Sequence, residues 1–220
     1  VHLKKVHWVY KLKQQLIPTE KSLWKVDKYN EFLKARRKMI ADSINEFLDD
    51  LRGQKPEEVV DYEGIIKDGE NDYVEFKSSL RWDYEQENVN KMLESVIAKT
   101  IAAFMNSGGG KLFIGIDDAG QILSIEKDCA PLKNKNKDGF LRQLTQVINQ
   151  YLGKEFNQYV VARIIKINDK DICIVNATSS AMPVYLKNEG KEEFYIRANA
   201  SSQPMSIREA NDYIRTNWEN

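Results

Sequence analysis

The stretch Glu70-Asn-Asp-Tyr-Val-Glu75-Phe-Lys77 decides the fold, because here a helical N-terminal pattern gives way to a strand pattern. From Tyr73 to Lys77 polar and apolar side chains alternate, and this period of two predicts a β-strand. Glu75 and Lys77 would then leave the same face of the sheet, while Phe76 between them would point into the core. The sequence therefore predicts a strand that presents a carboxylate and an ammonium group side by side.

The residues after this strand predict a helix, a buried strand and a turn. Residues 87–107 carry apolar side chains three and four positions apart, which is typical of an amphipathic helix. Gly108, Gly109 and Gly110 end that helix and lead into a short buried strand over residues 111–116. Asp117-Asp-Ala-Gly120 predicts a turn, and residues 121–125 are expected to pair back on the preceding strand.

The rest of the chain adds hairpins and two more helices. A second amphipathic helix is expected over residues 138–152, with Asp138 as its N-cap. Two hairpins are expected, with strands over residues 159–167, 171–177, 183–187 and 193–199. Ser206 and Glu209 form a capping box that begins a last helix, which runs to Trp218. This order predicts an α+β fold with a mixed, mostly antiparallel sheet and packed helices, preceded by an N-terminal helical segment.

The N-terminal part differs from the rest in pattern and in charge. An apolar stripe between residues 22 and 52 predicts a long helix, and the polar stretch Gly53-Gln-Lys-Pro-Glu-Glu58 is the best candidate for a linker. We therefore expect a helical segment and linker over residues 1–58 and one domain over residues 59–220. The chain begins with Val1, which suggests the tail of a larger protein. The first 59 residues carry 13 Lys and Arg against 9 Asp and Glu, and the remainder carry 20 against 24.

Composition limits the class of protein without identifying it. Lys and Arg together number 33, as do Asp and Glu, so the formal net charge is zero. A nucleic-acid partner would therefore have to be held by a local basic patch or through metal ions. No stretch approaches the roughly 18 apolar residues that a membrane span needs, so we expect no membrane association. Cys129 and Cys173 lack CxxC spacing, which argues against zinc and a disulfide and favours a reduced, cytoplasmic protein.

The acidic residues suggest a metal site. Glu75 and Lys77 on one strand face match the way metal-dependent nucleases place one metal ligand and one electrostatic stabiliser. Asp117 and Asp118 come at the end of the next strand, and one of them would complete a cluster of three carboxylates with Glu70 and Glu75. Hard oxygen ligands without a Cys or His set favour Mg²⁺ or Mn²⁺ over zinc. The alternative is that Glu-x-Lys is a solvated ion pair and that Asp-Asp-Ala-Gly is only a turn.

A longer resemblance includes these residues. It is carried by Glu70 to Lys77, Ile101-Ala-Ala-Phe-Met-Asn106-Ser-Gly-Gly-Gly110, Leu112-Phe-Ile-Gly-Ile-Asp-Asp118, Pro183-Val-Tyr185 and Phe194-Tyr-Ile-Arg197. Together these pieces resemble the Schlafen AlbA-like domain, with a departure at Arg197-Ala-Asn-Ala200, where the family usually has a glycine. The resemblance implies an association with nucleic acids. For nuclease members it implies two glutamates five apart and an aspartate after the glycine-containing strand. The glutamates fall on Glu70 and Glu75, and the aspartate falls on Asp117 or Asp118, of which Asp117 is nearer to the end of the strand. Glu70, Glu75 and Asp117 are therefore the expected metal ligands, and Lys77 joins them in the expected catalytic set.

Six basic side chains are candidates for nucleic-acid binding: Lys111, Lys133, Lys135, Lys137, Arg81 and Arg197. The run Lys133-Asn-Lys-Asn-Lys137 could bind phosphates, although a solvated loop is the more ordinary interpretation. Trp82 offers an aromatic face for stacking a base, or it is a packing residue. The glycines before Lys111 do not predict a P-loop, because the order of helix, glycines and strand is reversed.

We therefore expect a nucleic-acid-binding domain of Schlafen AlbA-like type, in a defence or regulatory protein, with RNA or DNA as its partner. The first alternative is a Mg²⁺- or Mn²⁺-dependent ribonuclease or nuclease, and the second is ATP binding. Two lobes face each other in the Schlafen proteins that the sequence resembles, whereas this chain carries one. We therefore also expect a homodimer, the alternative being that the N-terminal helix packs on its own domain.

Overall fold

The computed structural model describes residues 34, 36–38, 40–41, 44 and 60–218. The contacts of the chain divide it into two units, Val1–Val60 and Asp61–Asn220. In the first unit, residues 34, 36–38, 40–41 and 44 are helical, and Val60 is in neither a helix nor a strand. Most of the expected N-terminal stripe and the candidate linker lie outside the described residues. None of the described helices combines the length and the apolar character needed to cross a membrane.

A four-stranded mixed sheet forms the centre of the second unit. Its order is β1 (Val74–Lys77), β4 (Gly110–Ile114), β6 (Lys170–Ala177) and β5 (Val160–Ile167). β1 and β4 run parallel, whereas β4 with β6 and β6 with β5 run antiparallel. The predicted α+β fold with a mixed, mostly antiparallel sheet is confirmed.

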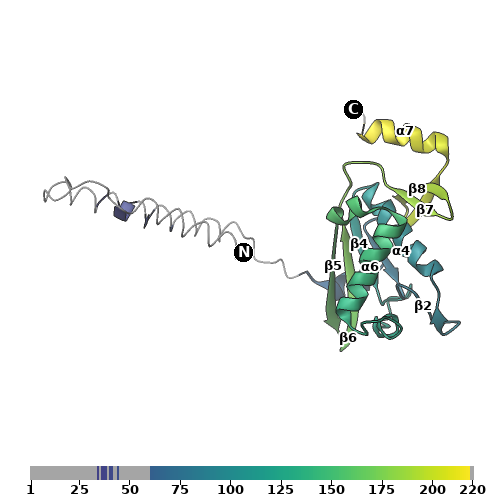
Figure 1. Cartoon of the computed structure of the whole chain (residues 1–220), viewed down its shortest axis with the longest axis horizontal. Helices are drawn as coiled ribbons and strands as arrows, with labels where there is room; N and C mark the ends of the chain where they lie inside the picture. Colours follow the sequence, from purple (N-terminus) through teal and green to yellow (C-terminus); the bar gives the residue numbers. More distant parts are fainter. Residues whose placement is uncertain (1–33, 35, 39, 42–43, 45–59, 219–220) are drawn as a thin grey trace. The chain divides into compact units, whose positions relative to one another are not determined.

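Helices cover both faces of this sheet because its side chains alternate (Figure 1). Leu112 and Ile114 pack in one apolar cluster with α4 (Met92–Met105) and α6 (Lys137–Tyr151), which lie over one face. Phe113 packs in a second cluster with Phe76 of β1 and with apolar residues of α3 (Tyr62–Asp68). Phe76 therefore points into the core, as predicted, and its neighbours Glu75 and Lys77 point to the opposite side of β1.

A second, antiparallel sheet joins the domain at the end of α4. It consists of β7 (Tyr185–Asn188), β8 (Lys191–Ala198) and β9 (Ser201–Met205), and α7 (Ile207–Trp218) follows it (Figure 1). The side chain of Asn106, just after α4, links the end of this helix to the sheet through hydrogen bonds. Its amide nitrogen donates to the carbonyls of Val184 and Tyr195, and its amide oxygen accepts from the Val184 N–H. The rings of Phe194, Tyr213 and Trp218 pack against one another beside it.

Three local predictions were wrong. α4 begins at Met92 and not near residue 87, because residues 82–89 form a small hairpin of β2 (Trp82–Asp83) and β3 (Asn88–Val89). α6 is capped by Asn136, whose side chain accepts from the Gly139 N–H at 2.8 Å, so Asp138 lies in the first turn of the helix. Residues 121–125 do not form a strand; a single bridge joins Ile116 to Ile122.

Two short helical segments complete the domain, and they were not expected from the sequence. α5 (Glu126–Cys129) precedes the loop that contains Lys133 and Lys135, which we call the lysine-containing loop, and the 3₁₀ segment η2 (Lys154–Tyr159) follows α6. Both connect longer elements, so hydrophobic periodicity over ten or more residues does not detect them.

Candidate nucleic-acid interface

β1 places Glu75 and Lys77 next to each other, as its alternation predicts. Lys77 Nζ donates to Glu75 Oε1 at 2.6 Å and to the carbonyl of Phe76 at 2.7 Å. Glu75 is nevertheless 8% exposed, so the pair is not the solvated surface pair that an edge strand usually carries. A buried carboxylate needs a further partner, because desolvation of an unpaired charge is costly.

Arg197 of β8 is that partner. Its Nη1 lies 2.7 Å from Glu75 Oε2, its Nη2 donates to the carbonyl of Asn71, and its guanidinium lies 4.8 Å from the centroid of the Phe104 ring. The side chain is 2% exposed. Arg197 is one of the expected nucleic-acid contacts, and its charge is buried and paired with Glu75 inside the domain. Its contact with nucleic acid stays a prediction.

The other two expected metal ligands have separate partners. Glu70 Oε1 accepts the N–H of Phe76 at 2.7 Å. Asp117 Oδ1 accepts the N–H groups of Ala119 and Gln121, so this carboxylate caps the turn after β4. Among the described residues no group of three or more His, Cys, Asp or Glu side chains could hold a metal ion. As arranged, Glu70, Glu75 and Asp117 do not fit a shared divalent ion, and the nuclease hypothesis stays a prediction.

A buried carboxylate that sequence reasoning missed organises the turn after β1. Asp128 of α5 is 1% exposed and accepts hydrogen bonds from the hydroxyl of Ser79 and from the N–H groups of Leu80, Arg81 and Trp82. Burial raises the pKa of Asp128, and these four donors act in the opposite direction. The contact joins residues 46 to 49 positions apart, so no local sequence signal could have identified it.

Asp128 thereby fixes the turn that carries Trp82, and the Trp82 and Tyr84 rings lie beside a lysine side chain. Lys127 Nζ is 5.5 Å from the ring centroid of Trp82 and 5.5 Å from that of Tyr84. Burial, followed by the charges of Asp128 and Glu126, raises the pKa of Tyr84 to about 12, so its ring stays neutral at physiological pH. Lys133 and Lys135 are exposed in the loop that follows α5. We call Trp82, Tyr84, Lys127, Lys133 and Lys135 the lysine–aromatic surface.

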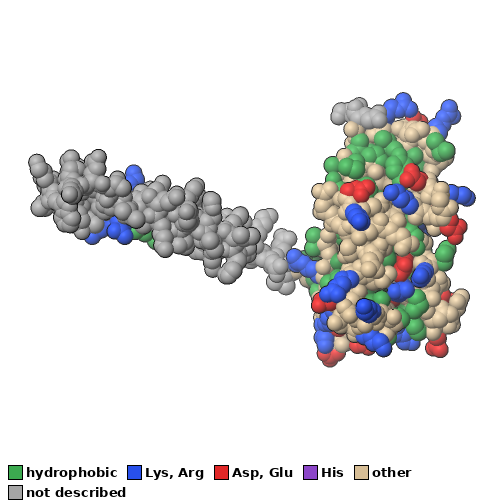
Figure 2. Space-filling model, viewed as in Figure 1, with side chains coloured by type: hydrophobic (Ala, Val, Ile, Leu, Met, Phe, Trp, Pro, Cys, Tyr) green, Lys and Arg blue, Asp and Glu red, His purple; other side chains and the backbone are tan. Residues whose placement is uncertain are grey.

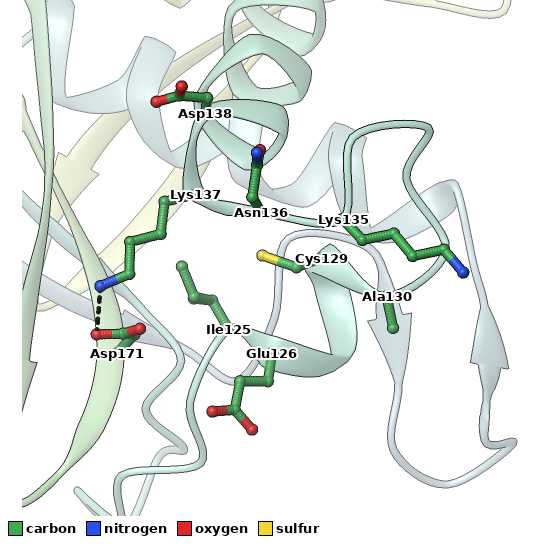
Figure 3. A pocket seen from close by; sticks show the side chains of 9 residues that line it. All are labelled: Ile125, Glu126, Cys129, Ala130, Lys135, Asn136, Lys137, Asp138 and Asp171. Atoms are coloured by element: carbon green, nitrogen blue, oxygen red, sulfur yellow. Dashed lines mark hydrogen bonds and ion pairs between the residues drawn. The ribbon is translucent and has the colours of Figure 1, made fainter.

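The remaining basic candidates are arranged differently. Lys137 Nζ pairs with Asp171 Oδ1 at 2.8 Å, whereas Lys135 extends away from this pair (Figure 3). Arg81 Nε lies 3.4 Å from Glu94 Oε1 and its side chain is 14% exposed, so Arg81 faces the interior more than solvent. Lys111 is half-buried on β4. On the face shown in Figure 2, Lys and Arg side chains lie in several places with acidic side chains between them.

A pocket of about 700 Å³ lies between α5, the lysine-containing loop and Asp171 (Figure 3). The Cys129 thiol is among its lining groups. Burial, followed by the negative charges of Asp128, Asp171 and Glu126, raises the pKa of this thiol to about 11. The thiol is therefore protonated at neutral pH, which does not suit a nucleophile or a soft-metal ligand.

The glycine segment ends α4 and begins β4, in the order that the sequence predicts. Gly109 has a φ of +78°, and a Cβ there would lie 2.8 Å from the carbonyl oxygen of Ala177, so this position requires glycine. The Gly109 N–H donates to the carbonyl of Phe104 at 3.0 Å. The segment therefore closes the C-terminal end of a helix, whereas a P-loop lies at a helix N-terminus.

Comparisons with known proteins give a family match and similar solved structures for this domain. The family model described as "Schlafen, AlbA_2" matches residues 70–206. Among solved structures, the DIP2311 protein of Corynebacterium diphtheriae is similar at 18% identity and a TM-score of 0.47, over 66% of this chain and 24% of that one. The N-terminal domain of a putative ATP-dependent DNA helicase RecG-related protein of Nitrosomonas europaea is similar at 20% identity and a TM-score of 0.35, over 50% of this chain and 74% of that one.

No curated protein sequence matches the chain. The chain spans about a quarter of the length of the corynebacterial protein. The family match covers the four-stranded and the three-stranded sheet, because it extends from Glu70, before β1, to Ser206, after β9. The chain therefore belongs to the Schlafen AlbA_2 family.

Proposed function

We propose that the domain binds single-stranded nucleic acid through the lysine–aromatic surface. The observation that carries the proposal is the position of Lys127, whose ammonium lies over the rings of both Trp82 and Tyr84. Single-stranded nucleic acids are held by positive charges that follow the backbone and by rings on which bases stack. The Schlafen AlbA_2 membership of the chain supports the same partner.

Typical interaction energies favour a nucleobase over the Lys127 ammonium as the group that lies on the Trp82 and Tyr84 rings. An exposed cation–π contact contributes about 0.5–1 kcal/mol. A base stacked on an aromatic ring contributes about 1–3 kcal/mol. A bound base would therefore displace the ammonium from the rings, and the freed Lys127 would bind a neighbouring phosphate together with Lys133 and Lys135.

Fluorescence anisotropy with labelled single-stranded and duplex RNA and DNA tests this proposal. We expect single strands to bind more tightly than duplexes, with an affinity that falls as salt rises. The variant Lys127→Ala/Lys133→Ala/Lys135→Ala should lower the slope of log K against log salt by about 2, since each phosphate contact contributes roughly 0.7.

A matched control removes three exposed lysines from elsewhere, in Lys166→Ala/Lys187→Ala/Lys191→Ala. This control should keep the wild-type slope. Equal losses in both variants would mean that overall charge, and not the lysine–aromatic surface, determines binding. Light scattering on the same samples tests the expected homodimer.

The nuclease alternative is tested in the same samples. Labelled strands incubated with Mn²⁺ or with EDTA are resolved by length, and the melting temperature is measured with and without the ion. Cleavage that requires Mn²⁺ and is lost in Glu75→Gln would favour the enzyme, whereas intact strands and an unchanged melting temperature would favour a binding domain.

A further inference from the structure

A polar pocket of about 560 Å³ lies at the other end of β1 from the lysine–aromatic surface. Four separated parts of the chain line it: the residues before β1, the end of α4 with its glycine segment, the connection between β6 and β7, and the chain from β8 to α7. Its volume is large enough to hold a nucleobase.

The charge of this pocket does not suit a phosphate. Arg197 lines it, but its guanidinium is already paired with Glu75 at 2.7 Å. Asp72 adds an exposed carboxylate, and the C-terminal end of α4 adds the negative end of a helix dipole. A neutral group with hydrogen-bond donors fits this field better than an anion.

The pocket also offers unused hydrogen-bonding groups. Within residues 60–218 the N–H groups of Gly108 and Ser179 donate to no acceptor. Asp72 Oδ1 accepts the Ala200 N–H at 2.9 Å, while Asp72 Oδ2 accepts no hydrogen bond from the described residues. Donors beside an acceptor complement the edge of a nucleobase, which carries both kinds of group.

An aromatic ring stands beside these groups. Tyr73 is 62% exposed, although large aromatic side chains are usually covered. A Cβ on Gly108 would lie 3.1 Å from Tyr73 Cε1, so the glycine lets this ring lie against the loop. One face of an exposed ring is thereby available for stacking.

We propose that this pocket takes one unpaired nucleobase of the bound strand, stacked on Tyr73, an inference that rests on the proposed nucleic-acid binding. Asp72 accepts from an exocyclic amino group of the base. Adenine, cytosine and guanine carry such a group and uracil does not, so strands of A or C bind more tightly than strands of U.

The test compares strands of about 12 nucleotides, within the range of single-strand site sizes. Oligo(A), oligo(C) and oligo(U) are titrated beside an abasic oligomer of equal length, which keeps the phosphates and removes every base. Wild-type protein is expected to bind oligo(A) at least tenfold more tightly than the abasic oligomer.

Three variants assign this preference to the pocket. Tyr73→Ala should lose about tenfold in affinity for oligo(A) and nothing for the abasic oligomer, whereas Tyr73→Phe, which keeps the ring, should bind as wild type. Asp72→Asn keeps an oxygen for the Ala200 N–H and should reduce the preference for oligo(A) over oligo(U). Circular dichroism melting of each variant confirms that the domain is folded.

The outcomes separate the two proposals. If wild type and Tyr73→Ala bind oligo(A) equally well, the pocket does not take a base, while nucleic-acid binding stands. If wild type binds the abasic oligomer as tightly as oligo(A), phosphates alone are recognised and the base pocket is again excluded. If no oligomer binds, both proposals fail.

Discussion

Two groups of charged residues in this domain have opposite environments. Glu75 and Arg197 face each other at 2.7 Å in the interior, where Arg197 is 2% exposed. Lys133 and Lys135 lie in an exposed loop. A buried pair must stay paired, because losing one partner leaves an uncompensated charge, whereas an exposed lysine is hydrated and free to exchange water for a phosphate. Burial, and not residue type, therefore separates the charges that hold the fold from those that can bind a partner.

The largest expected effect comes from breaking the buried pair. Arg197→Met should destabilise the domain by about 4 kcal/mol, because Lys77 would be the one cation left beside the buried Glu75 among the residues that the structure describes. For a domain of this size that corresponds to a melting temperature lower by roughly 10 °C. Urea unfolding followed by circular dichroism measures the change.

The double variant Glu75→Gln/Arg197→Met provides the control. It removes both charges, so it should be more stable than Arg197→Met alone, and the difference measures the coupling between the two residues. A cost below about 1 kcal/mol for Arg197→Met would contradict the importance of the pair.

A smaller loss is expected at the second buried carboxylate. Asp128→Ala leaves the Ser79 hydroxyl and the Leu80 N–H without their acceptor. The N–H groups of Arg81 and Trp82 lose one of two acceptors, because both also donate to the Ser79 hydroxyl oxygen. We expect a cost of about 3 kcal/mol, because part of this turn can reach water. The same unfolding experiment measures it. The substitution should also weaken single-strand binding, since the turn that carries Trp82 would no longer be fixed. Unchanged stability would show that water replaces the carboxylate.

The contribution of Asp128 should depend on pH in a defined direction. Its pKa is raised in the folded protein, so the folded state binds more protons than the unfolded state, in which the pKa is near 3.8. Stability from this group is complete below that value and is lost as the pH rises through the folded pKa. The difference in free energy of unfolding between wild type and Asp128→Asn should therefore become smaller as the pH rises. A difference that grows with pH would mean that folding lowers the pKa of Asp128.

The smallest effect on stability is expected at the exposed lysines. Lys127→Ala/Lys133→Ala/Lys135→Ala should change the free energy of unfolding by no more than about 0.5 kcal/mol, because exposed side chains contribute little to it. The same variant should lose salt-dependent nucleic-acid binding. A destabilisation as large as that of Asp128→Ala would mean that these lysines hold the fold.

Periodicity identified the parts of the fold that depend on neighbouring residues. The alternation around Glu75 predicts β1 and the side on which Phe76 packs, and the glycines after Asn106 predict the end of α4. The small hairpin over residues 82–89 was missed, because its two strands of two residues are too short for a periodic signal. The cap of α6 was placed on Asp138, since both Asn136 and Asp138 are good capping residues and only the backbone dihedral angles decide between them.

The family resemblance, the α+β class and the pairing of Glu75 with Lys77 can be predicted from the sequence, because each depends on local order or spacing. The sequence does not predict that Arg197, which is 122 residues from Glu75, neutralises its charge in the interior. The same holds for Asp128, whose hydrogen bonds to the turn after β1 join residues 46 to 49 positions apart. The physical reason is that burial and long-range hydrogen bonds arise when distant segments pack, and no local pattern of residues records which segments meet.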